Sequence, residues 1–290
     1  MNIQKTTSAP SAPGIYAGLS NSDYHAGPGV SKSQLDKLAK SPFHYHAHYL
    51  SLKRVSTYET PAMRFGTAVH TAILEPEIFA GWVVMPDVDG RTKEGKAAKA
   101  LALEEAASRG VEVIAADDYE KVTAIADSFS RHKHLATFLD TGHAELSVYW
   151  TDPDTGILCR CRPDWLAPDC VLDLKTTEDA SPRAFQRSAY GWRYWVQAAY
   201  YLDGLAANGV DASGFVFAAI EKSEPYACAG YAASEAMIAA GREEYRRLLR
   251  TLRQCQDDDH WPGYGESLNM LDLPGYANEL FTSPNDAIAL

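Results

Sequence analysis

Residues 163–175 read PDWLAPDCVLDLK, and this stretch says most about the fold and chemistry of the chain. Asp164 lies at the end of one β-like run, and Asp173 and Lys175 lie two residues apart on the next. Side chains alternate between strand faces, so Asp173 and Lys175 should share one face and their leucine neighbours the packed face. Carboxylates suit Mg²⁺, and bound ions stabilise the attacking and leaving oxygens of a phosphodiester. The stretch predicts a hairpin with a magnesium site beside a lysine, although the triplet alone would also suit a surface ion pair.

The composition is that of a globular protein without a membrane helix. The 290 residues are 46% hydrophobic and 22% charged, and no window approaches the roughly 20 apolar residues that span a bilayer. The five cysteines form no CxxC pair, which favours free thiols in a reducing cytoplasm over a zinc or iron–sulfur site. The net charge of −11 argues against nonspecific DNA binding by a lone monomer, although a local field in a cleft can oppose the net charge.

The hydrophobic periodicity changes along the chain and predicts an α/β fold. Helical patterns come first, over residues 43–50, 62–75, 93–109 and 117–139. Alternating patterns then predict a three-strand meander over residues 145–150, 157–162 and 171–176. After it come a helix over 182–207, a buried strand over 215–220 paired with 226–231, and a long helix capped by Ser234. This order predicts a mixed central sheet flanked by helices, with a helical N-terminal elaboration.

The domain organisation expected from this pattern is simple. Residues 1–13 are rich in Ser, Thr, Ala and Pro and predict a disordered tail. Residues 14–265 contain no linker-like stretch and predict one domain. Residues 266–290 predict an irregular C-terminal tail.

Three sequence elements together resemble a known class of nucleases. The stretch 163–175 resembles the PD-(D/E)XK nuclease motif, including its leading proline. Downstream, Gln197 and Tyr201 lie four apart on one helix face and resemble the QxxxY element of the RecB and λ-exonuclease-like branch. Upstream, GTAVH at residues 66–70 resembles the GxxxH helix in which these nucleases place a histidine ligand. Each element alone is weak, whereas all of them in this order on the expected helix, strands and helix are specific.

Longer segments are similar to the exonuclease VIII (RecE) family of PD-(D/E)XK nucleases. The similarity covers about residues 15–265, the nuclease portion of that family. The segments that carry it are residues 22–29, 142–145, 156–164 and 173–177.

The resemblance implies the metal ligands. Asp173 is expected to anchor the metal ions, Asp164 to complete the main site, and the carbonyl of Leu174 to add an oxygen ligand. His70 is expected to ligate a second ion through neutral imidazole. The ions would be Mg²⁺, two per site, with Mn²⁺ as a substitute. Glu145 is an additional candidate that reaches the metal through a water, or equally a structural partner of an arginine across the strand pair.

The resemblance also implies the catalytic roles. Lys175 would orient or activate the attacking water and offset developing negative charge. Gln197 and Tyr201 would hold Lys175, the water or the scissile phosphate. Five arginines near the motif could hold DNA phosphates, about half of them being ordinary surface or ion-pair residues: Arg160, Arg162, Arg183, Arg187 and Arg193. The aromatic residues Tyr190, Trp192 and Trp195 could stack on bases or equally pack in the core.

The function implied by the resemblance is that of a Mg²⁺-dependent 5′-to-3′ exodeoxyribonuclease acting on double-stranded DNA ends. Such an enzyme releases mononucleotides and leaves 3′ single-stranded tails for recombination. The family further implies a toroidal homo-oligomer, often a tetramer, a RecT-like single-strand annealing partner, and a cytoplasmic enzyme encoded by a bacterium or prophage. One alternative is a RecB- or Cas4-like nuclease at single-stranded ends, although the four-cysteine cluster usual in Cas4-like enzymes is missing. The other alternative is a catalytically silent DNA-binding assembly protein. The presence of Asp164, Asp173 and Lys175 argues against it.

Overall fold

A mixed five-stranded sheet forms the centre of the protein in this computed structural model, which describes residues 1–52, 60–265, 267–268 and 270–271. The strand order is β11-β10-β9-β8-β5, in which β9 and β10 run parallel and every other neighbouring pair is antiparallel. The bounds are β5 His143–Ala144, β8 Trp165–Leu166, β9 Cys170–Thr177, β10 Gly214–Glu221 and β11 Cys228–Ala232. The predicted mixed sheet flanked by helices is confirmed.

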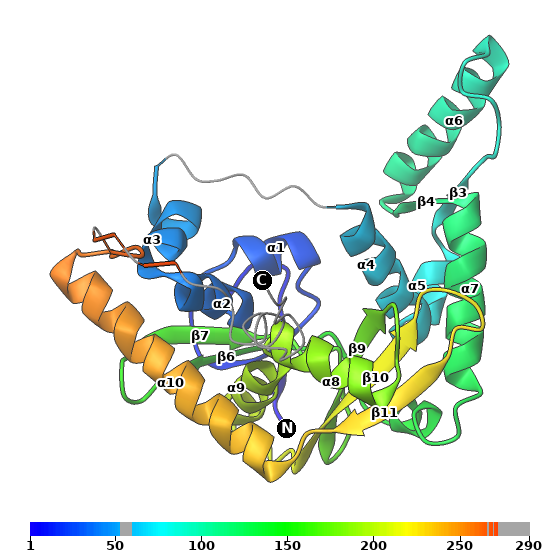
Figure 1. Cartoon of the computed structure of the whole chain (residues 1–290). Coiled ribbons are helices and arrows are strands. Elements are labelled where there is room, and N and C mark those ends of the chain that lie inside the picture. Colours follow the sequence, from blue (N-terminus) through cyan, green and yellow to red (C-terminus); the bar gives the residue numbers. More distant parts are fainter. Residues whose placement is uncertain (53–59, 266, 269, 272–290) are drawn as a thin grey trace, which may run out of the picture.

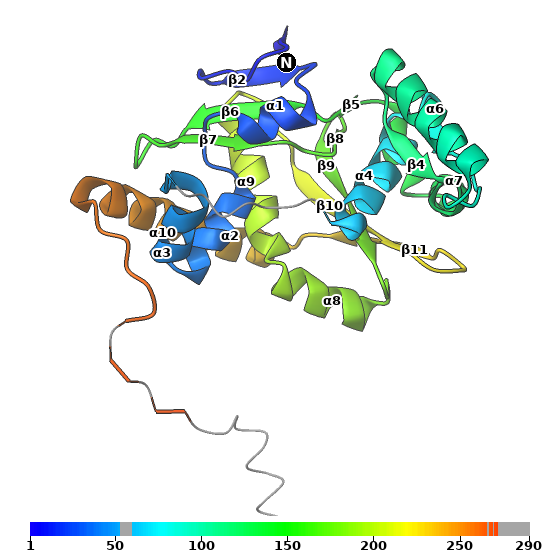
Figure 2. The same cartoon turned by 90° about the horizontal axis from the view of Figure 1, so that it is seen from above.

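Two helical layers cover the faces of this sheet (Figures 1 and 2). Helices α4 (Pro61–Leu74) and α7 (Ala116–Ser130) pack on the face that carries Leu172 and Leu174. Helix α9 (Tyr194–Ala206), backed by α10 (Glu235–Asp258), packs on the opposite face. The alternation of β9 therefore directs its leucines into the α4–α7 layer, as the sequence predicts, and Asp173 toward α9.

A second sheet, of order β1-β2-β6-β7, corrects two expectations from the sequence. Its strands are β1 Ile3–Lys5, β2 Gly14–Ala17, β6 Ser147–Thr151 and β7 Leu158–Cys161. The predicted disordered tail over residues 1–13 contains β1, which pairs parallel to β2 and lays Ile3 against the core. The predicted meander is also wrong, because its first two strands lie in this sheet and its third, β9, lies in the central sheet.

The chain passes between the two sheets at two breaks that face each other. The first break is at Glu145, the first residue of the predicted strand 145–150, whose φ of 52° is in the left-handed region. The second break is around Asp164, between the end of β7 and the start of β8. The Glu145 N–H donates to the Asp164 carbonyl over 3.1 Å. A left-handed backbone costs roughly 1–2 kcal/mol for a residue with a Cβ, so the surrounding structure must stabilise it. The bend in the chain therefore fixes the orientation of Glu145.

The remaining elements surround the two sheets. They are α1 Asn21–Ala26, α2 Lys32–Lys40, α3 Pro42–Tyr45, a π-helical turn η1 His46–Leu50, α5 Pro76–Ala80, β3 Val83–Met85, α6 Lys93–Arg109, β4 Val113–Ala115, a 3₁₀ turn η2 Ala136–Asp140 and α8 Pro182–Gly191. The helix predicted over 93–109 is confirmed, with Thr92 as its N-cap.

Three predicted helices differ from the structure in detail. The helix over 43–50 changes to a π-helical turn at His46, so Tyr45 is buried while Phe43 and Leu50 are exposed. The helix over 117–139 ends at Ser130. The helix over 182–207 is broken into α8 and α9, because Arg193 takes a left-handed conformation with φ 55°.

Two further observations concern composition. In the described part of the chain, no helix has the length and apolar character needed to cross a membrane. All five cysteines carry free thiols.

The predicted C-terminal tail over 266–290 lies almost wholly outside the described residues.

Candidate active site

The acidic residues predicted from the sequence meet in the central sheet at the point where β8 stops pairing with β9. We call this open end of the β8–β9 hairpin the sheet edge. Asp164 immediately precedes β8, and its Oδ2 accepts a hydrogen bond of 2.7 Å from the Leu174 N–H on β9. The predicted hairpin is thus present, and the side chain of Asp164 takes the place of the next backbone partner of Leu174.

Three possible metal ligands gather at this edge. One ligand atom from each of His70, Glu145 and Asp164 lies within 4.8 Å of the others. His70 comes from α4, and its Nδ1 lies 3.4 Å from Asp164 Oδ2. An imidazole nitrogen and two carboxylates are a donor set that binds divalent first-row ions as well as Mg²⁺. The residues therefore fit the metal that the sequence motif implies.

The protonation of Glu145 supports the same conclusion. Burial disfavours its carboxylate and the negative charge of Asp164 adds to the effect, so the pKa of Glu145 is raised to about 8. A bound divalent cation would reverse this effect, because it favours the charged form of both carboxylates. Arg162 lowers the pKa of Glu145 in part, and Glu145 in turn raises the pKa of Arg162, whose Nε and Nη2 donate to Ser147 and Leu19. The geometry of the cluster therefore agrees with the metal-ligand alternative for Glu145, and Arg162 adds an electrostatic interaction.

The carbonyl of Leu174 faces the same side as these ligands. In an antiparallel ladder a residue directs its N–H and C=O toward the same neighbour, so the C=O of Leu174 points toward Asp164. Extending the observed pairing of Trp165 with Leu172 by two residues would set Pro163 opposite Leu174. Proline has no N–H to donate. The leading proline of the motif therefore leaves this carbonyl without the ladder partner that any other residue would offer.

Asp173 lies next to the cluster, fully buried, with both oxygens in contact with side chains. Its Oδ2 accepts a 2.6 Å hydrogen bond from Gln197 Nε2 on α9, and its Oδ1 pairs with the ammonium of Lys175. Burial and the charge of Asp164 raise the pKa of Asp173 to about 7, although Lys175 opposes the shift. Gln197 was predicted to hold Lys175, a water or the phosphate, and it holds Asp173 instead.

Lys175 is held as a cation. Burial alone would lower its pKa, but Asp173, Asp164 and Tyr194 outweigh burial, and the pKa is raised. The Nζ atom lies 4.8 Å from the centre of the Tyr194 ring, a cation–π contact. Sequence reasoning did not place Tyr194 in the site. Its position three residues before Gln197 on one helix face was the signal that could have found it.

The break between α8 and α9 sets the position of Tyr194. Lys32 Nζ donates to the carbonyl of Trp192 over 2.6 Å and pairs with Asp36 Oδ2 over 2.7 Å. Arg193 pairs with Asp36 over 3.2 Å and with Glu244 over 2.9 Å. These contacts between α2, α10 and the break occupy Arg193, so its predicted role at a phosphate is replaced by a structural one.

Tyr201 lies one turn after Gln197 and is half-buried. Its ring packs edge-on to Phe215 at 6.0 Å. Burial and then the neighbouring Tyr24 and Asp173 raise the pKa of its hydroxyl well above the usual value. The charge of Asp173 acts on this hydroxyl, and the four-residue spacing sets Tyr201 on the same face of α9 as Gln197.

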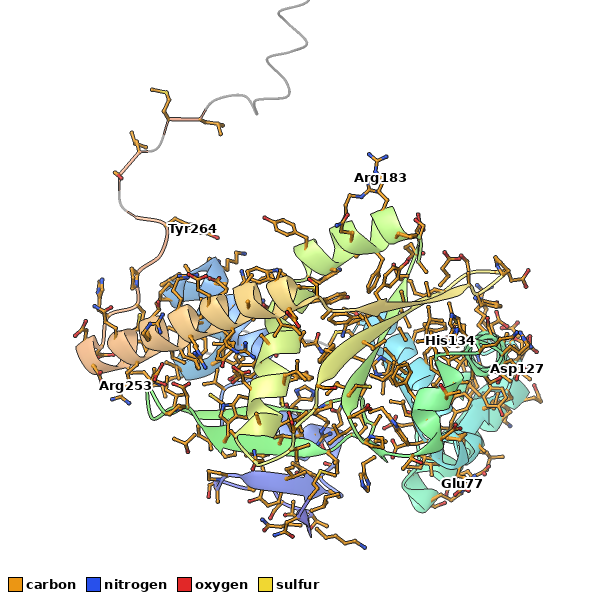
Figure 3. All side chains as sticks on the ribbon, turned by 90° about the horizontal axis from the view of Figure 1, so that it is seen from below. Glu77, Asp127, His134, Arg183, Arg253 and Tyr264 are labelled. Atoms are coloured by element: carbon orange, nitrogen blue, oxygen red, sulfur yellow. The ribbon has the colours of Figure 1, made fainter. Side chains whose placement is uncertain are left out.

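Two of the predicted DNA-binding arginines are structural. Arg160 is 2% exposed, and its guanidinium donates to the carbonyls of Tyr24 and Gly27, the latter over 2.6 Å. Arg162 donates to Ser147 Oγ over 2.7 Å and to a backbone carbonyl. Their guanidinium groups are inside the protein, where a phosphate cannot reach them. Arg183 and Arg187 are exposed, and Figure 3 shows Arg183 directed away from the body of the protein.

Arg160→Met is expected to destabilise the fold without acting on DNA binding directly. The methionine would leave the buried carbonyls of Tyr24 and Gly27 without donors, so the free energy of unfolding should fall by about 3 kcal/mol. Urea unfolding measures this, with Arg187→Met as the exposed control. A variant with unchanged unfolding but weakened DNA binding would contradict the structural role.

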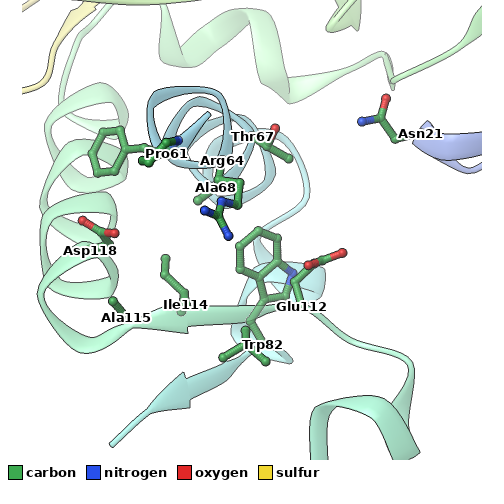
Figure 4. Close-up of a pocket in the computed structure, with 12 residues that line it drawn as sticks. Asn21, Pro61, Arg64, Thr67, Ala68, Trp82, Glu112, Ile114, Ala115 and Asp118 are labelled. Carbon is green, nitrogen blue, oxygen red and sulfur yellow. The ribbon is translucent and has the colours of Figure 1, made fainter. Parts of the chain in front are cut away.

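A pocket of about 410 Å³ lies between α4, β4 and the start of α7 (Figure 4). Arg64 and Thr67 of α4 line it together with Trp82 and Ile114. None of the three clustered ligands lines this pocket. The chemistry is therefore expected at the open sheet edge.

Comparisons with known proteins agree with this arrangement. Residues 31–274 match the model of a family described as "PDDEXK-like domain of unknown function (DUF3799)". A crystal structure named "Putative exonuclease", from Eubacterium rectale, superposes with a TM-score of 0.58 at 12% identity, covering 91% of this chain and 98% of its own. At that identity the likeness shows the fold alone. No protein with a curated description matches the chain.

Proposed function

Because the chain belongs to the family of PDDEXK-like domains (DUF3799) and has a PD-(D/E)XK nuclease fold, we propose that it is a metal-dependent exodeoxyribonuclease. The observation that carries this proposal is the convergence of two groups at one sheet edge. His70, Glu145 and Asp164 form a metal-binding cluster, and Asp173 with Lys175 forms a buried ion pair beside it. Neither a surface ion pair nor a silent scaffold requires a buried carboxylate next to two others.

The roles of the residues follow from their contacts. His70, Glu145 and Asp164 would hold a metal ion, with the Leu174 carbonyl as a further oxygen ligand. Asp173, which the resemblance names as an anchor of the ions, has one oxygen bonded to Gln197 and the other paired with Lys175, so we propose that it acts beside the ion. A second ion is proposed from the resemblance alone. When bound, a divalent cation of this kind supplies Lewis-acid stabilisation of phosphate oxygens and an activated water. Mg²⁺, with Mn²⁺ as a substitute, is the ion we propose.

Lys175 would act as a cation rather than as a base. Its raised pKa keeps the ammonium protonated at neutral pH, so no lone pair is free to take a proton from water. The ammonium instead donates hydrogen bonds to the attacking water or to a phosphate oxygen and offsets the charge that develops there. Gln197 fixes Asp173, and Asp173 with Tyr194 fixes Lys175.

The finer specificity comes from the resemblance to the exonuclease VIII family. We propose degradation of linear duplex DNA in the 5′-to-3′ direction, with release of mononucleotides and formation of 3′ tails for recombination. The same resemblance supports a toroidal tetramer and a RecT-like annealing partner in the cytoplasm of a bacterium. A ring would also concentrate local basic groups around DNA despite the net charge of −11.

The test is digestion of a linear duplex that carries a label at one 5′ end. With Mg²⁺ we expect early release of labelled mononucleotide, and with a chelator we expect no release. A covalently closed circular duplex is the matched control and should remain intact. Labelled strands that shorten gradually would contradict 5′-to-3′ polarity, and nicking of the circle would contradict exonuclease action.

A further inference from the structure

The outer face of α8, together with Trp192 at the C-terminal end of the helix, combines exposed aromatic rings with exposed cations. Arg183, Arg187 and Tyr190 follow one another at i, i+4 and i+7, which places them on one helix face. The Tyr190 side chain is 79% exposed, and Trp192, just after the helix, is 68% exposed. Large aromatic rings usually lie at least half inside a protein or at an interface, so two such rings in the open indicate a binding surface.

The two arginines are free to bind a ligand. Most arginines near the active site are occupied, since Arg160 and Arg162 bind backbone carbonyls and Arg193 bridges two acidic residues. Within the described ranges, the side chains of Arg183 and Arg187 are exposed and make neither a hydrogen bond nor an ion pair, and the charge of Arg187 acts on the exposed Asp179. Figure 3 shows the guanidinium of Arg183 projecting from α8. In a chain with a net charge of −11, a stripe of unpaired positive charge beside exposed rings suits a polyanion with flat bases.

This surface lies across α8 from the residues of the active site. The inner face of α8 carries the buried Phe185, whose ring lies 6.0 Å from that of Tyr194. Tyr194 in turn contacts Lys175. The outer face is therefore about one helix diameter, roughly 10–12 Å, beyond the residues that hold the catalytic lysine. Figure 2 shows α8 standing out from the body of the protein next to β9 and β10.

We propose that the outer face of α8 binds single-stranded DNA next to the point of cleavage, an inference that rests on the proposed function. Arg183 and Arg187 contact phosphates, and Tyr190 and Trp192 stack on bases. The aromatic rings favour single-stranded over duplex DNA, because base faces are accessible to stacking only where the bases are unpaired. Phosphate contacts alone would suit either form.

Binding of a labelled oligothymidylate of about 16 nucleotides, measured by fluorescence anisotropy in a chelator, tests the surface without hydrolysis. One variant pair is Arg183→Gln with Arg187→Gln, and its control is Arg91→Gln with Arg250→Gln, which removes two exposed charges elsewhere. The steepness of log affinity against log salt should fall by about 1.4 in the first pair, since each single-strand phosphate contact contributes about 0.7. The control pair should change it far less.

The aromatic half is tested with Tyr190→Ala and Trp192→Ala, and the control is Phe43→Ala with Tyr264→Ala, which are 58% and 70% exposed. Loss of stacking should weaken oligothymidylate binding about tenfold or more and duplex binding by less than twofold. Equal loss on both DNA forms, or binding that matches the control pair, would overturn the proposal. So would an aromatic variant that only changes the oligomeric state in sedimentation, since the face would then belong to a second copy of the chain.

The outcomes separate this surface from the proposed function. A wild type that binds the oligonucleotide through α8 but releases no nucleotides supports the surface and refutes the nuclease. A wild type that degrades duplex DNA, with α8 variants that bind and degrade like their controls, supports the nuclease and refutes the surface.

Discussion

Lys175→Met is expected to reduce the rate of nucleotide release from linear duplex DNA by about 10²–10⁴-fold, the range typical for a group that assists the reacting water. The methionine fills a similar volume but removes the ammonium that lies between Asp173 and the Tyr194 ring. Lys32 is a second cation whose charge acts on Asp173, but its ammonium is held by Asp36 and the Trp192 carbonyl, so the developing phosphate charge would lose its nearest protein partner. Single-turnover digestion with saturating Mg²⁺ measures the chemical step.

The control for this variant is Lys222→Met, which removes a lysine that pairs with Glu178 away from the site. It should digest DNA at the wild-type rate. Lys175→Arg keeps the charge but replaces a compact ammonium by a planar guanidinium, and we expect only partial recovery. Wild-type activity in Lys175→Met would refute the catalytic assignment and favour a structural ion pair.

Asp173→Asn is expected to abolish activity while making the metal-free protein more stable above neutral pH. The carboxylate is fully buried beside Asp164, and these conditions raise its pKa from 3.8 to about 7. Asparagine has the same shape, can still accept a hydrogen bond from Gln197, and carries no charge to bury. Loss of an anionic group at the metal edge should lower the digestion rate by about 10³-fold or more, on the scale of removing one essential electrostatic group.

The pH dependence of this effect has a definite sign. A carboxyl whose pKa is higher in the folded state lowers stability as pH rises from its unfolded pKa of 3.8 through its folded pKa of about 7. Below pH 4 the wild-type Asp173 is protonated in both states, so variant and wild type should melt at similar temperatures. Above pH 7 the variant should melt higher, by roughly 2 °C or more for each kcal/mol gained. Thermal melts in a chelator at pH 5 and pH 8 measure this, and a variant that melts lower at both would show that the Lys175 pair outweighs burial.

Patterns local in sequence predicted which elements carry the central residues of the candidate site. The alternation over residues 171–176 assigned Asp173 and Lys175 to one face of β9, and the structure agrees. The spacing of Gln197 and Tyr201 and the helix bearing His70 also placed these residues on elements that meet at the sheet edge. These features depend on strand and helix periods, which the sequence records directly.

Features that depend on distant contacts could not be predicted in the same way. Arg160 was a candidate for holding DNA phosphates, but β7 is covered on both faces and its arginine donates to backbone carbonyls from α1. The break at Arg193 has no glycine or proline to mark it, because acidic residues from α2 and α10 stabilise the left-handed turn. The break at Glu145, where the chain passes from one sheet to the other, likewise has no glycine or proline that would predict it.

The proline before Asp164 limits how far β8 and β9 pair, and so keeps backbone and side-chain groups of the candidate site out of the sheet. Strand pairing tends to propagate, since each added backbone bond orders residues that already lie next to a formed ladder. If β8 and β9 extended by two more residues, so that residue 163 paired with Leu174, the carbonyl of Leu174 would be used for sheet growth and Asp164 would lose its place beside the Leu174 N–H. Pro163 stops that growth by lacking a donor. The hairpin is thus kept one bond short of its most paired state, and the polar groups left over at its open end are those that the proposed function assigns to the metal.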